Sequence, residues 1–218
     1  MREEMMQFER MYWDQELKYI AGVDEVGRGC LCGDVVAAAV ILPVGMDISG
    51  VTDSKKISEK KREALFEVIM QQAIAVGVGR VDAAMIDQIN IKQATRLAMR
   101  MAVENLGVQA EALLVDAEKI DLNLPQQAII KGDERSISIA AASIIAKVTR
   151  DRLCVDWDRA YPQYGIAVHK GYGTALHRKQ YNQFGASPIH RQSFLTKWNV
   201  NKGGDSHGSG ELETEFAE

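Results

Sequence analysis

The sequence predicts an α/β fold in which a mixed β-sheet is flanked by helices and followed by a C-terminal helical extension. Short apolar runs rich in valine and isoleucine occur early in the chain, segments with helical spacing intervene, and only helical segments follow residue 136. Alternating strands and helices are typical of layered α/β domains. With 218 residues, the chain is long enough for one sizeable core.

Three segments are expected along the chain. Residues 1–18 form an N-terminal lead-in, a short helix or a loose segment. Residues 19–200 form the folded domain, including the C-terminal helical part. Residues 201–218 are rich in glycine, serine and acids, a composition that predicts disorder.

Short apolar runs predict the strands of the sheet. The run from Val35 to Leu42 is continuous and ends at Pro43, which is typical of a buried strand. The segment from Asp24 to Gly33 is rich in glycine and is predicted to be a loop. The complete set of predicted strands is 19–23, 35–42, 74–81, 112–115 and 127–130.

Polar residues that can cap helices precede the segments with helical spacing. Ser58, Asn90 and Ser136 each stand at such a position, and Gly107 and Gly185 follow the ends of two segments. The predicted helices are 58 to about 72, 91–106, 136–160, 174–184 and a short one after residue 190.

Several classes of protein are disfavoured. No uncharged apolar run reaches the ~18 residues that a membrane span needs, and the first 18 residues carry five acids and no apolar stretch of a signal peptide. A cytoplasmic, soluble protein is therefore expected. The three cysteines do not suggest a disulfide framework. Cys30 and Cys32 are interpreted as small residues of a packed turn, because no second pair completes a zinc pattern.

Charge is distributed unevenly. Of 30 acids and 26 bases in the chain, 25 of each remain when the tail from Asn201 is set aside. Residues 160–200 contain no acid, but hold five lysines or arginines, three histidines and seven aromatic residues. Such a segment suits a nucleic-acid backbone with stacked bases or sugars, although a solvated basic face is an equal alternative.

Acidic residues follow the predicted strands. Asp24 and Glu25 come directly after one apolar run, Asp116 follows another, and Asp133 stands between a strand and the long helix. Converging carboxylates need a counter-charge, and their hard oxygens suit Mg²⁺ or Mn²⁺ in a phosphodiester hydrolase. The alternative roles are helix caps and turns, and this alternative is strongest for Asp133.

Gly27-Arg28-Gly29 follows the acid pair. Its glycines permit close approach of the backbone to a sugar or a phosphate. A dinucleotide loop is disfavoured, because the spacing to Gly33 departs from the fingerprint and the acids would repel a pyrophosphate.

At this point the sequence resembles type 2 ribonuclease H, the prokaryotic ribonuclease HII. The resemblance covers about residues 19–198 and rests on eight motifs in the family's order. They are Gly22-Val-Asp-Glu-Val-Gly-Arg-Gly29, Asp53-Ser-Lys-Lys56, Leu114-Val-Asp116, Lys131-Gly-Asp133, the run from Ala141 to Asp151, Tyr161-Pro-Gln-Tyr-Gly165, His169-Lys-Gly-Tyr-Gly-Thr174 and His190-Arg-Gln-Ser-Phe194.

The resemblance implies a ribonuclease H-like fold and an endonuclease that cuts 5′ to a ribonucleotide, leaving 3′-hydroxyl and 5′-phosphate ends. Its partners would be RNA–DNA hybrids and duplex DNA with embedded ribonucleotides, with no membrane partner, and a monomer is expected. The implied catalytic and metal-binding acids are Asp24, Glu25, Asp116 and Asp133, with Mn²⁺ or Mg²⁺. Gly27, Arg28 and Gly29 match the motif that senses the 2′-hydroxyl, and Tyr172 matches the tyrosine that packs on the sugar.

Other polar residues are candidate substrate contacts. Ser143, Lys147 and Arg150 share one helix face. Basic side chains are the candidate phosphate contacts, some of them expected to be bystanders: Lys55, Lys56, Lys147, Arg150, Lys170 and Arg191. His169 and His190 are left out of the catalytic set, because two metals need no histidine base.

The chain departs from the family at two positions, where Cys30 and Asp34 replace prolines that the family often has. Two alternatives remain. One is another nuclease of the same superfold, such as type 3 ribonuclease H or a junction resolvase, although type 3 enzymes have a longer N-terminal domain and lack the Gly-Arg-Gly form. The other is a non-catalytic binder of hybrids, which the complete set of acids disfavours.

Overall fold

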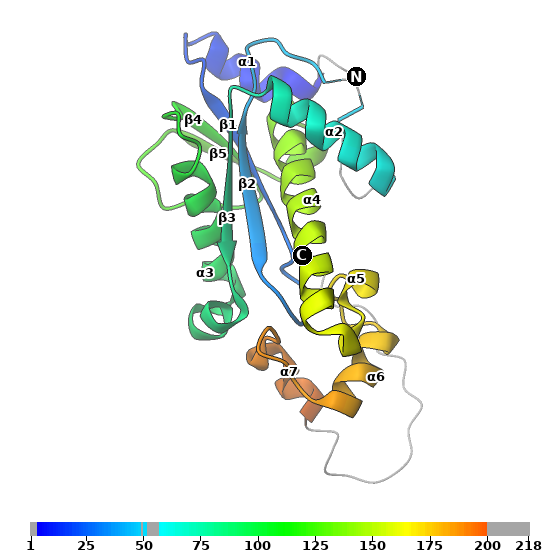
Figure 1. The fold of residues 1–218 in the computed structure, drawn as a ribbon. Helices are drawn as coiled ribbons and strands as arrows, with labels where there is room; N and C mark the ends of the chain where they lie inside the picture. The colour runs from blue at the N-terminus through cyan, green and yellow to red at the C-terminus, as the bar shows by residue number, and fades with distance from the viewer. Residues whose placement is uncertain (1–3, 49, 52–56, 200–218) are drawn as a thin grey trace.

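The computed structural model describes residues 4–48, 50–51 and 57–199. A five-stranded sheet with the order β3-β2-β1-β4-β5 forms the centre of the molecule (Figure 1). β1 pairs antiparallel with β2 and parallel with β4, which confirms the predicted mixed sheet. The strands are β1 Ile20–Val26, β2 Val35–Ile41, β3 Ala75–Val81, β4 Ala112–Asp116 and β5 Gln126–Ile129.

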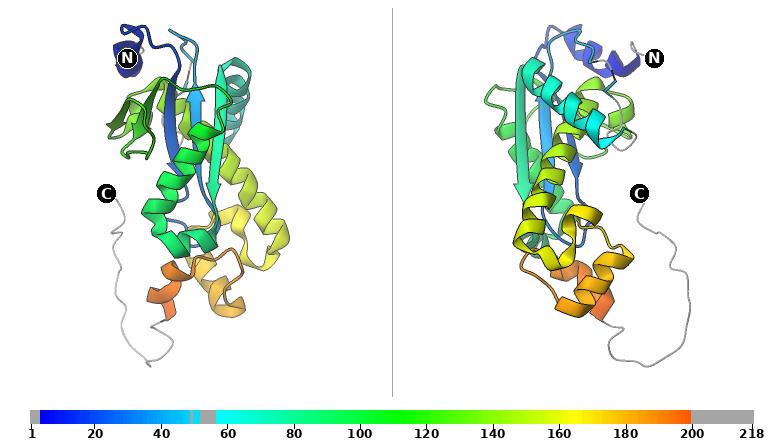
Figure 2. Two further views of the ribbon diagram at one scale, coloured as in Figure 1. Left: turned by 90° about the vertical axis from the view of Figure 1, so that its left-hand side faces the viewer. Right: turned by 45° about the vertical axis from the view of Figure 1, so that its right-hand side comes forward.

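Helices cover both faces of the sheet. α3 lies on one face and α2 and α4 lie on the other (Figure 1), while α5, α6 and α7 gather beyond one end of the sheet (Figure 2). The α-helices are α1 Gln7–Trp13, α2 Glu59–Gln72, α3 Ala83–Glu104, α4 Ile137–Ala160, α5 Ile166–His169, α6 Ala175–Phe184 and α7 Gln192–Asn199. Short 3₁₀ turns are η1 Glu4–Met6, η2 Gly132–Glu134 and η3 Pro162–Tyr164.

The core consists of two layers separated by the sheet. In β2, Ala37 and Ala39 pack in the cluster that includes α3, whereas Ala38 and Val40 pack in the cluster that includes α2 and α4. This alternation is the period of two that a strand buried on both faces requires. Gly22 in β1 brings α4 close, because a Cβ there would lie only 2.1 Å from the Ser138 carbonyl carbon.

The starts of three helices agree with the sequence prediction. The side chains of Ser58, Ser136 and Thr174 accept hydrogen bonds from backbone N–H groups in the first turns of α2, α4 and α6. The prediction for α3 was incomplete, because this helix begins at Ala83 rather than after Asn90. Asn90 does accept from Gln93 N at 3.1 Å, but it stands at a kink with φ 67° inside the helix.

The prediction that β1 ends at Val23 was wrong. The strand continues to Val26, and Asp24 and Glu25 lie opposite Ala38 and Ala37 of β2. A partner strand with free hydrogen-bonding groups extends β1 despite the low strand propensity of acids. The first part of the predicted loop is therefore rigid sheet.

The N-terminal segment is packed against the sheet. Phe8 of α1 belongs to a buried cluster with Leu114 of β4. Glu9 is fully buried, and its Oε1 accepts from the Ser136 hydroxyl at 2.6 Å and from Ser138 N at 3.0 Å. A carboxylate that accepts from an N–H group in the first turn stabilises the start of α4.

In the part of the chain that the structure describes, no helix combines the length and apolar character that crossing a membrane requires. The predictions for Lys55, Lys56, the Asp53–Lys56 motif and the 201–218 tail lie outside the described residues.

Candidate active site

Three of the four predicted acids converge where β1 and β4 end side by side. Asp24, Glu25 and Asp116 each place a carboxylate oxygen within 4.8 Å of the others; we call these residues the acid cluster. Asp24 is 6% exposed and the other two are half-buried. The parallel pairing of β1 with β4 brings the two strand ends together.

The acid cluster carries unbalanced negative charge. Burial raises the pKa of Asp24 well above its ordinary value, and repulsion from Glu25 and Asp116 adds to this, while a hydrogen bond from Ser143 opposes it. Burial also raises the pKa of Glu25, partly offset by Arg28. Glu25 Oε2 is buried without a hydrogen-bond partner among the described residues. A hard divalent cation fits this donor set, because it would neutralise the charge and occupy the open oxygen.

Asp133 is not part of the acid cluster in the described structure. It lies half-buried in η2, the turn that precedes α4. The neighbouring Gly132 N donates to Asp116 Oδ1 at 2.6 Å, so this turn is tied directly to the cluster. Asp133 therefore stands beside the site, one residue from a group that contacts it.

A cavity of about 340 Å³ adjoins the acid cluster. Predicted residues from β1, α4 and the turn before α6 line it: Asp24, Glu25, Ser143, Lys147, Lys170 and Tyr172. The same cavity is also lined by three residues that were not predicted as site residues from the sequence, Glu59, Arg62 and Asp151.

Asp151 organises the basic side of this cavity. Its carboxylate accepts from Lys147 Nζ at 2.7 Å and from Arg62 Nη1 at 3.4 Å. All three side chains are at most 16% exposed. Two cations are thus held on the wall of the same cavity as Asp24 and Glu25. The spacing of Lys147 and Asp151, four residues apart on α4, was a usable signal, whereas Arg62 comes from α2 and only the fold brings it here.

Arg28 is held by acids. Its Nη1 lies 3.2 Å from Glu25 Oε1 and its Nη2 lies 3.9 Å from Glu118 Oε1, while Arg96 Nε lies 3.0 Å from Glu118 Oε2. Sequence reasoning missed Glu118 and Arg96, because the pairs join β1, the segment after β4, and α3.

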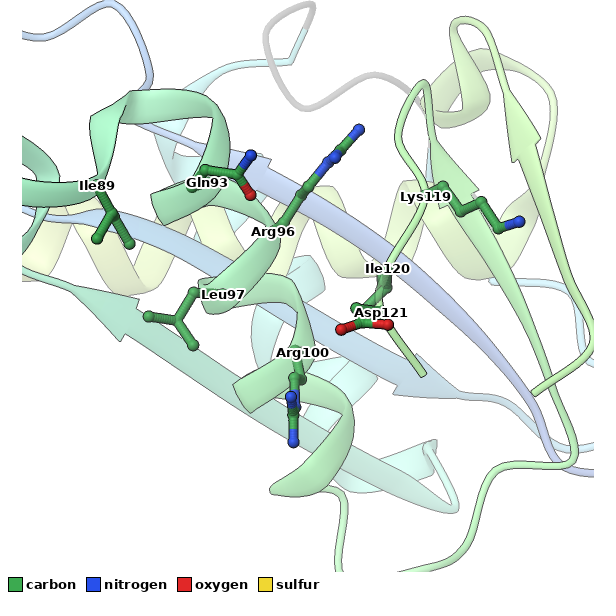
Figure 3. Close-up of a pocket in the computed structure, with 8 residues that line it drawn as sticks. All are labelled: Ile89, Gln93, Arg96, Leu97, Arg100, Lys119, Ile120 and Asp121. Atoms are coloured by element: carbon green, nitrogen blue, oxygen red, sulfur yellow. The ribbon is translucent and has the colours of Figure 1, made fainter. Parts of the chain in front are cut away.

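These contacts lead to a second cavity of about 690 Å³ (Figure 3). Side chains of α3 and of the segment after β4 line it: Ile89, Gln93, Arg96, Leu97, Arg100, Lys119, Ile120 and Asp121. It is larger than the first cavity but contains neither the acid cluster nor Tyr172. The smaller cavity is therefore the better candidate for chemistry.

The two glycines of Gly27-Arg28-Gly29 have different surroundings. Gly27 is buried at φ 95°, and a Cβ there would lie 2.3 Å from Arg150 Nε, so the protein's own packing requires glycine. Gly29 is exposed, and nothing lies within 4 Å of the position of a Cβ. The protein's own packing thus excludes a side chain at Gly27, whereas a side chain at Gly29 would meet no other part of the protein within 4 Å.

The interpretation of Arg150 and Arg191 as phosphate contacts was wrong. Both are fully buried. Arg150 donates to the carbonyl oxygens of Asp34, Cys32 and Lys170, and Arg191 donates to those of Gly33 and Arg28. A guanidinium group offers five donors, enough to hold several turns of irregular backbone. These arginines fix the loop from Arg28 to Asp34.

Tyr172 lines the same cavity as Asp24 and Glu25 and is 43% exposed. It follows Gly171, whose φ of 88° turns the backbone. Burial of part of the ring raises the pKa of the Tyr172 hydroxyl, and Cys30 nearby adds to the effect. Asp34 lies elsewhere, in an ion pair with Arg80 at 2.8 Å.

Comparisons with known proteins agree on one family. A family model described as ribonuclease HII matches residues 21–197. The ribonuclease HII of Alkaliphilus metalliredigens is 58% identical over 198 residues, covering 88% of this chain and 97% of that protein. That of Alkaliphilus oremlandii is 53% identical, covering 87% and 96%. The crystal structure of ribonuclease H2 from Pyrococcus horikoshii superposes with a TM-score of 0.70 at 26% identity, covering 84% of this chain and 97% of the other.

Proposed function

This chain belongs to the ribonuclease HII family, and from that premise we propose that it is an endoribonuclease that hydrolyses the RNA strand of RNA–DNA hybrids. The proposal includes duplex DNA with a single ribonucleotide, nicked on the 5′ side to leave 3′-hydroxyl and 5′-phosphate ends. The observation that carries the proposal is the convergence of Asp24, Glu25 and Asp116 beside a cavity with a basic wall.

The acid cluster is the proposed holder of Mg²⁺ or Mn²⁺. Ions held there would supply the charge stabilisation and the activation of water that hydrolysis of a phosphodiester needs. The raised pKa of Asp24 and the unpartnered Glu25 Oε2 support this role, because both are relieved by a bound cation. We assign Asp133 to the same set, since η2 is tied to Asp116 through Gly132.

The rest of the cavity is proposed to hold the substrate. Lys147, Lys170 and Arg62 face the position of a phosphate, where their charges offset the repulsion of the acids. Ser143 stands beside Asp24 on the wall formed by α4.

The ribonucleotide itself is proposed to lie between Gly29 and Tyr172. A 2′-hydroxyl distinguishes RNA from DNA. Reading it requires open backbone, which Gly29 offers next to Arg28. Tyr172 would pack on the adjoining sugar. Gly27 contributes by allowing the loop to pass close to Arg150. Lys55 remains a proposed phosphate contact on the basis of the family motif.

The same proposal describes a monomeric cytoplasmic enzyme of ribonucleotide excision repair with residues 19–200 as its catalytic unit. Because the chain matches the ribonuclease HII family, we do not propose the alternatives of a type 3 enzyme or a junction resolvase.

The decisive experiment is a cleavage assay on a DNA duplex with one ribonucleotide, alongside a long RNA–DNA hybrid. The wild type is assayed with Mg²⁺, with Mn²⁺ and with chelator, beside Asp24→Asn. Asp156→Asn is a matched control, because Asp156 is an exposed acid paired with Arg159 on α4. We expect metal-dependent nicking 5′ to the ribonucleotide that is lost in Asp24→Asn and kept in Asp156→Asn.

Each other outcome has a definite meaning. If the hybrid were cleaved but the single-ribonucleotide duplex were not, the proposal that Gly29 and Tyr172 recognise a single ribonucleotide would be overturned. Binding of both substrates without cleavage under either metal would overturn the enzymatic proposal in favour of a non-catalytic hybrid binder.

A further inference from the structure

Three of the four histidines lie buried beneath the turn that carries Tyr172. His169, His177 and His190 are 6%, 0% and 2% exposed. His169 ends α5, His177 stands in the first turn of α6 and His190 precedes α7. The rings of His169 and His177 stack with centroids 4.1 Å apart. None belongs to the acid cluster, so the proposed chemistry leaves them without a role.

Cys32 gives this group the spacing of a metal site. Its Sγ and one nitrogen each of His177 and His190 all lie within 4.8 Å of one another. A thiolate with two imidazoles suits zinc or copper. Such a site requires a deprotonated thiol and a free lone pair on each coordinating nitrogen. The hydrogen bonds of the rings show whether these nitrogens have lone pairs free for a metal or are already engaged in a hydrogen-bonded network.

One backbone donor determines where the ring protons are. Ser187 N–H lies 3.0 Å from His190 Nδ1 and Ser187 Oγ lies 2.7 Å from the same nitrogen. Because Nδ1 accepts from the backbone N–H, we assign the proton of a neutral His190 to Nε2. His190 Nε2 lies 3.1 Å from His177 Nε2 and donates to it. His177 therefore carries its proton on Nδ1, which lies 2.9 Å from the Tyr172 carbonyl oxygen and donates to it.

The protonation states agree with this assignment. Burial lowers the pKa of both His177 and His190 to about 4, so both rings are neutral at neutral pH. Burial raises the pKa of Cys32 to about 12, so its thiol keeps its proton. His190 Nε2 has no free lone pair, and these groups form a hydrogen-bonded chain that runs from Ser187 to Tyr172.

The same region is tied to the Gly-Arg-Gly loop. Leu31 N donates to Gly171 O at 2.8 Å, directly before Tyr172. Cys32 forms an antiparallel bridge with His190, and Gly33 N donates to Ile189 O at 2.8 Å. The carbonyl of Tyr172 and the loop after Gly29 are thus anchored to one scaffold around His190.

We infer that His177 and His190 are positioning residues that fix Tyr172 relative to Gly29 through a directed chain of hydrogen bonds. The inference rests on the proposed function, in which Tyr172 and Gly29 together read the ribonucleotide. A carbonyl held by an N–H donor from a fully packed ring leaves the Tyr172 backbone little freedom, and orientation of this kind contributes strongly to catalytic rate.

The first test reads the protons directly and does not depend on activity. Two-bond ¹H–¹⁵N spectra of the labelled full chain should show opposite tautomers, with the proton of His177 on Nδ1 and that of His190 on Nε2. The same sample is titrated with Zn²⁺. The same tautomer in both rings, or stoichiometric zinc bound by Cys32 and the two histidines, would overturn the inference.

The second test uses two substitutions of one ring. In His177→Asn the side-chain NH₂ takes the place of Nδ1–H, whereas in His177→Gln it takes the place of Nε2, so only asparagine keeps the donor to Tyr172. We expect Gln to cleave the single-ribonucleotide duplex roughly tenfold more slowly than Asn, with equal melting temperatures. In a Tyr172→Ala background the two variants should be equal, because the effect acts through Tyr172.

The failures can be told apart. Equal rates for Asn and Gln, or a difference that persists in Tyr172→Ala, would overturn the inference while the wild type remains active. A wild type that cleaves neither substrate would overturn the proposed function, and the tautomer measurement would still test the histidine chain.

Discussion

The acid cluster is buried at Asp24 and half-buried at Glu25 and Asp116, and the pair of His177 and His190 is buried, yet their polar atoms are satisfied very differently. Every ring nitrogen of the histidine pair has a hydrogen-bond partner. In the acid cluster, by contrast, like charges repel and Glu25 Oε2 has no partner among the described residues. Burying unpaired charge destabilises the folded state unless a bound ligand compensates for it. Because the acid cluster combines like charges with an unpartnered oxygen, we interpret it as a binding site and the histidine pair as a support.

The largest effect is expected when one negative charge is removed from the acid cluster. In Asp116→Asn the amide oxygen can still accept from Gly132 N, so the shape is kept and one charge is lost. We expect cleavage of an RNA–DNA hybrid to fall at least about a hundredfold, measured as a single-turnover rate with saturating Mn²⁺.

Glu111→Gln is the control for this variant. Glu111 precedes the same strand at its other end, where it accepts from Lys18 N and Tyr19 N. It should keep the wild-type rate. If Asp116→Asn kept more than half of that rate, the cluster would not be the site of chemistry.

The next effect concerns stability. A cation that binds only the folded protein stabilises it by about 2.7 kcal/mol at a hundred times its Kd. Mn²⁺ should therefore raise the thermal midpoint of the wild type, and Asp24→Asn should lose most of this rise. In chelator the order should reverse, since Asp24→Asn removes the repulsion that raises the pKa of Asp24. An equal response to metal in both proteins would contradict the assignment.

A smaller effect is expected on the basic side of the cavity. Arg62→Gln removes one cation from the pair held by Asp151. KM for the hybrid should rise about tenfold, and the slope of log affinity against log salt should shrink by about one. Arg152→Gln is the matched control, because Arg152 is half exposed and pairs with Glu63 and Glu67. Equal KM values for the two variants would exclude a phosphate contact at Arg62.

The smallest effect comes from the histidine pair and concerns how the free energy of unfolding changes with pH. Both pKa values lie near 4 in the folded protein, below the ordinary 6.5, so the unfolded chain takes up protons first as the pH falls. Stability should be complete above pH 6.5 and decline between 6.5 and 4. At pH 6 the loss is about 1 kcal/mol for each histidine.

Denaturant unfolding at pH 7.5 and pH 6 measures this decline. His177→Asn has one titrating ring fewer and should lose about half as much stability as the wild type. An unchanged pH dependence in this variant would show that the pair is already charged or open to solvent.

Local features of the sequence predicted most of the fold. Ser58, Ser136 and Thr174 are caps whose partners lie three residues away, and apolar runs mark the strands wherever both faces are buried. Predictions failed where distant pairing overrode local preference. Asp24 and Glu25 belong to β1 only because β2 pairs with them, and the helix before Asn90 was missed because its kink interrupts the pattern.

The sequence by itself determined the family, the α/β class and the acids near the ends of β1 and β4, because these depend on residue order and on the positions of the apolar runs. Tertiary structure alone decided which polar residues share a site. It brought Arg62 to Asp151, gathered Asp24, Glu25 and Asp116 at one edge of the sheet, and buried Arg150 and Arg191 against backbone carbonyls. The reason is physical: an exposed phosphate contact and a buried support carry the same guanidinium, and only packing determines whether water or the protein surrounds it.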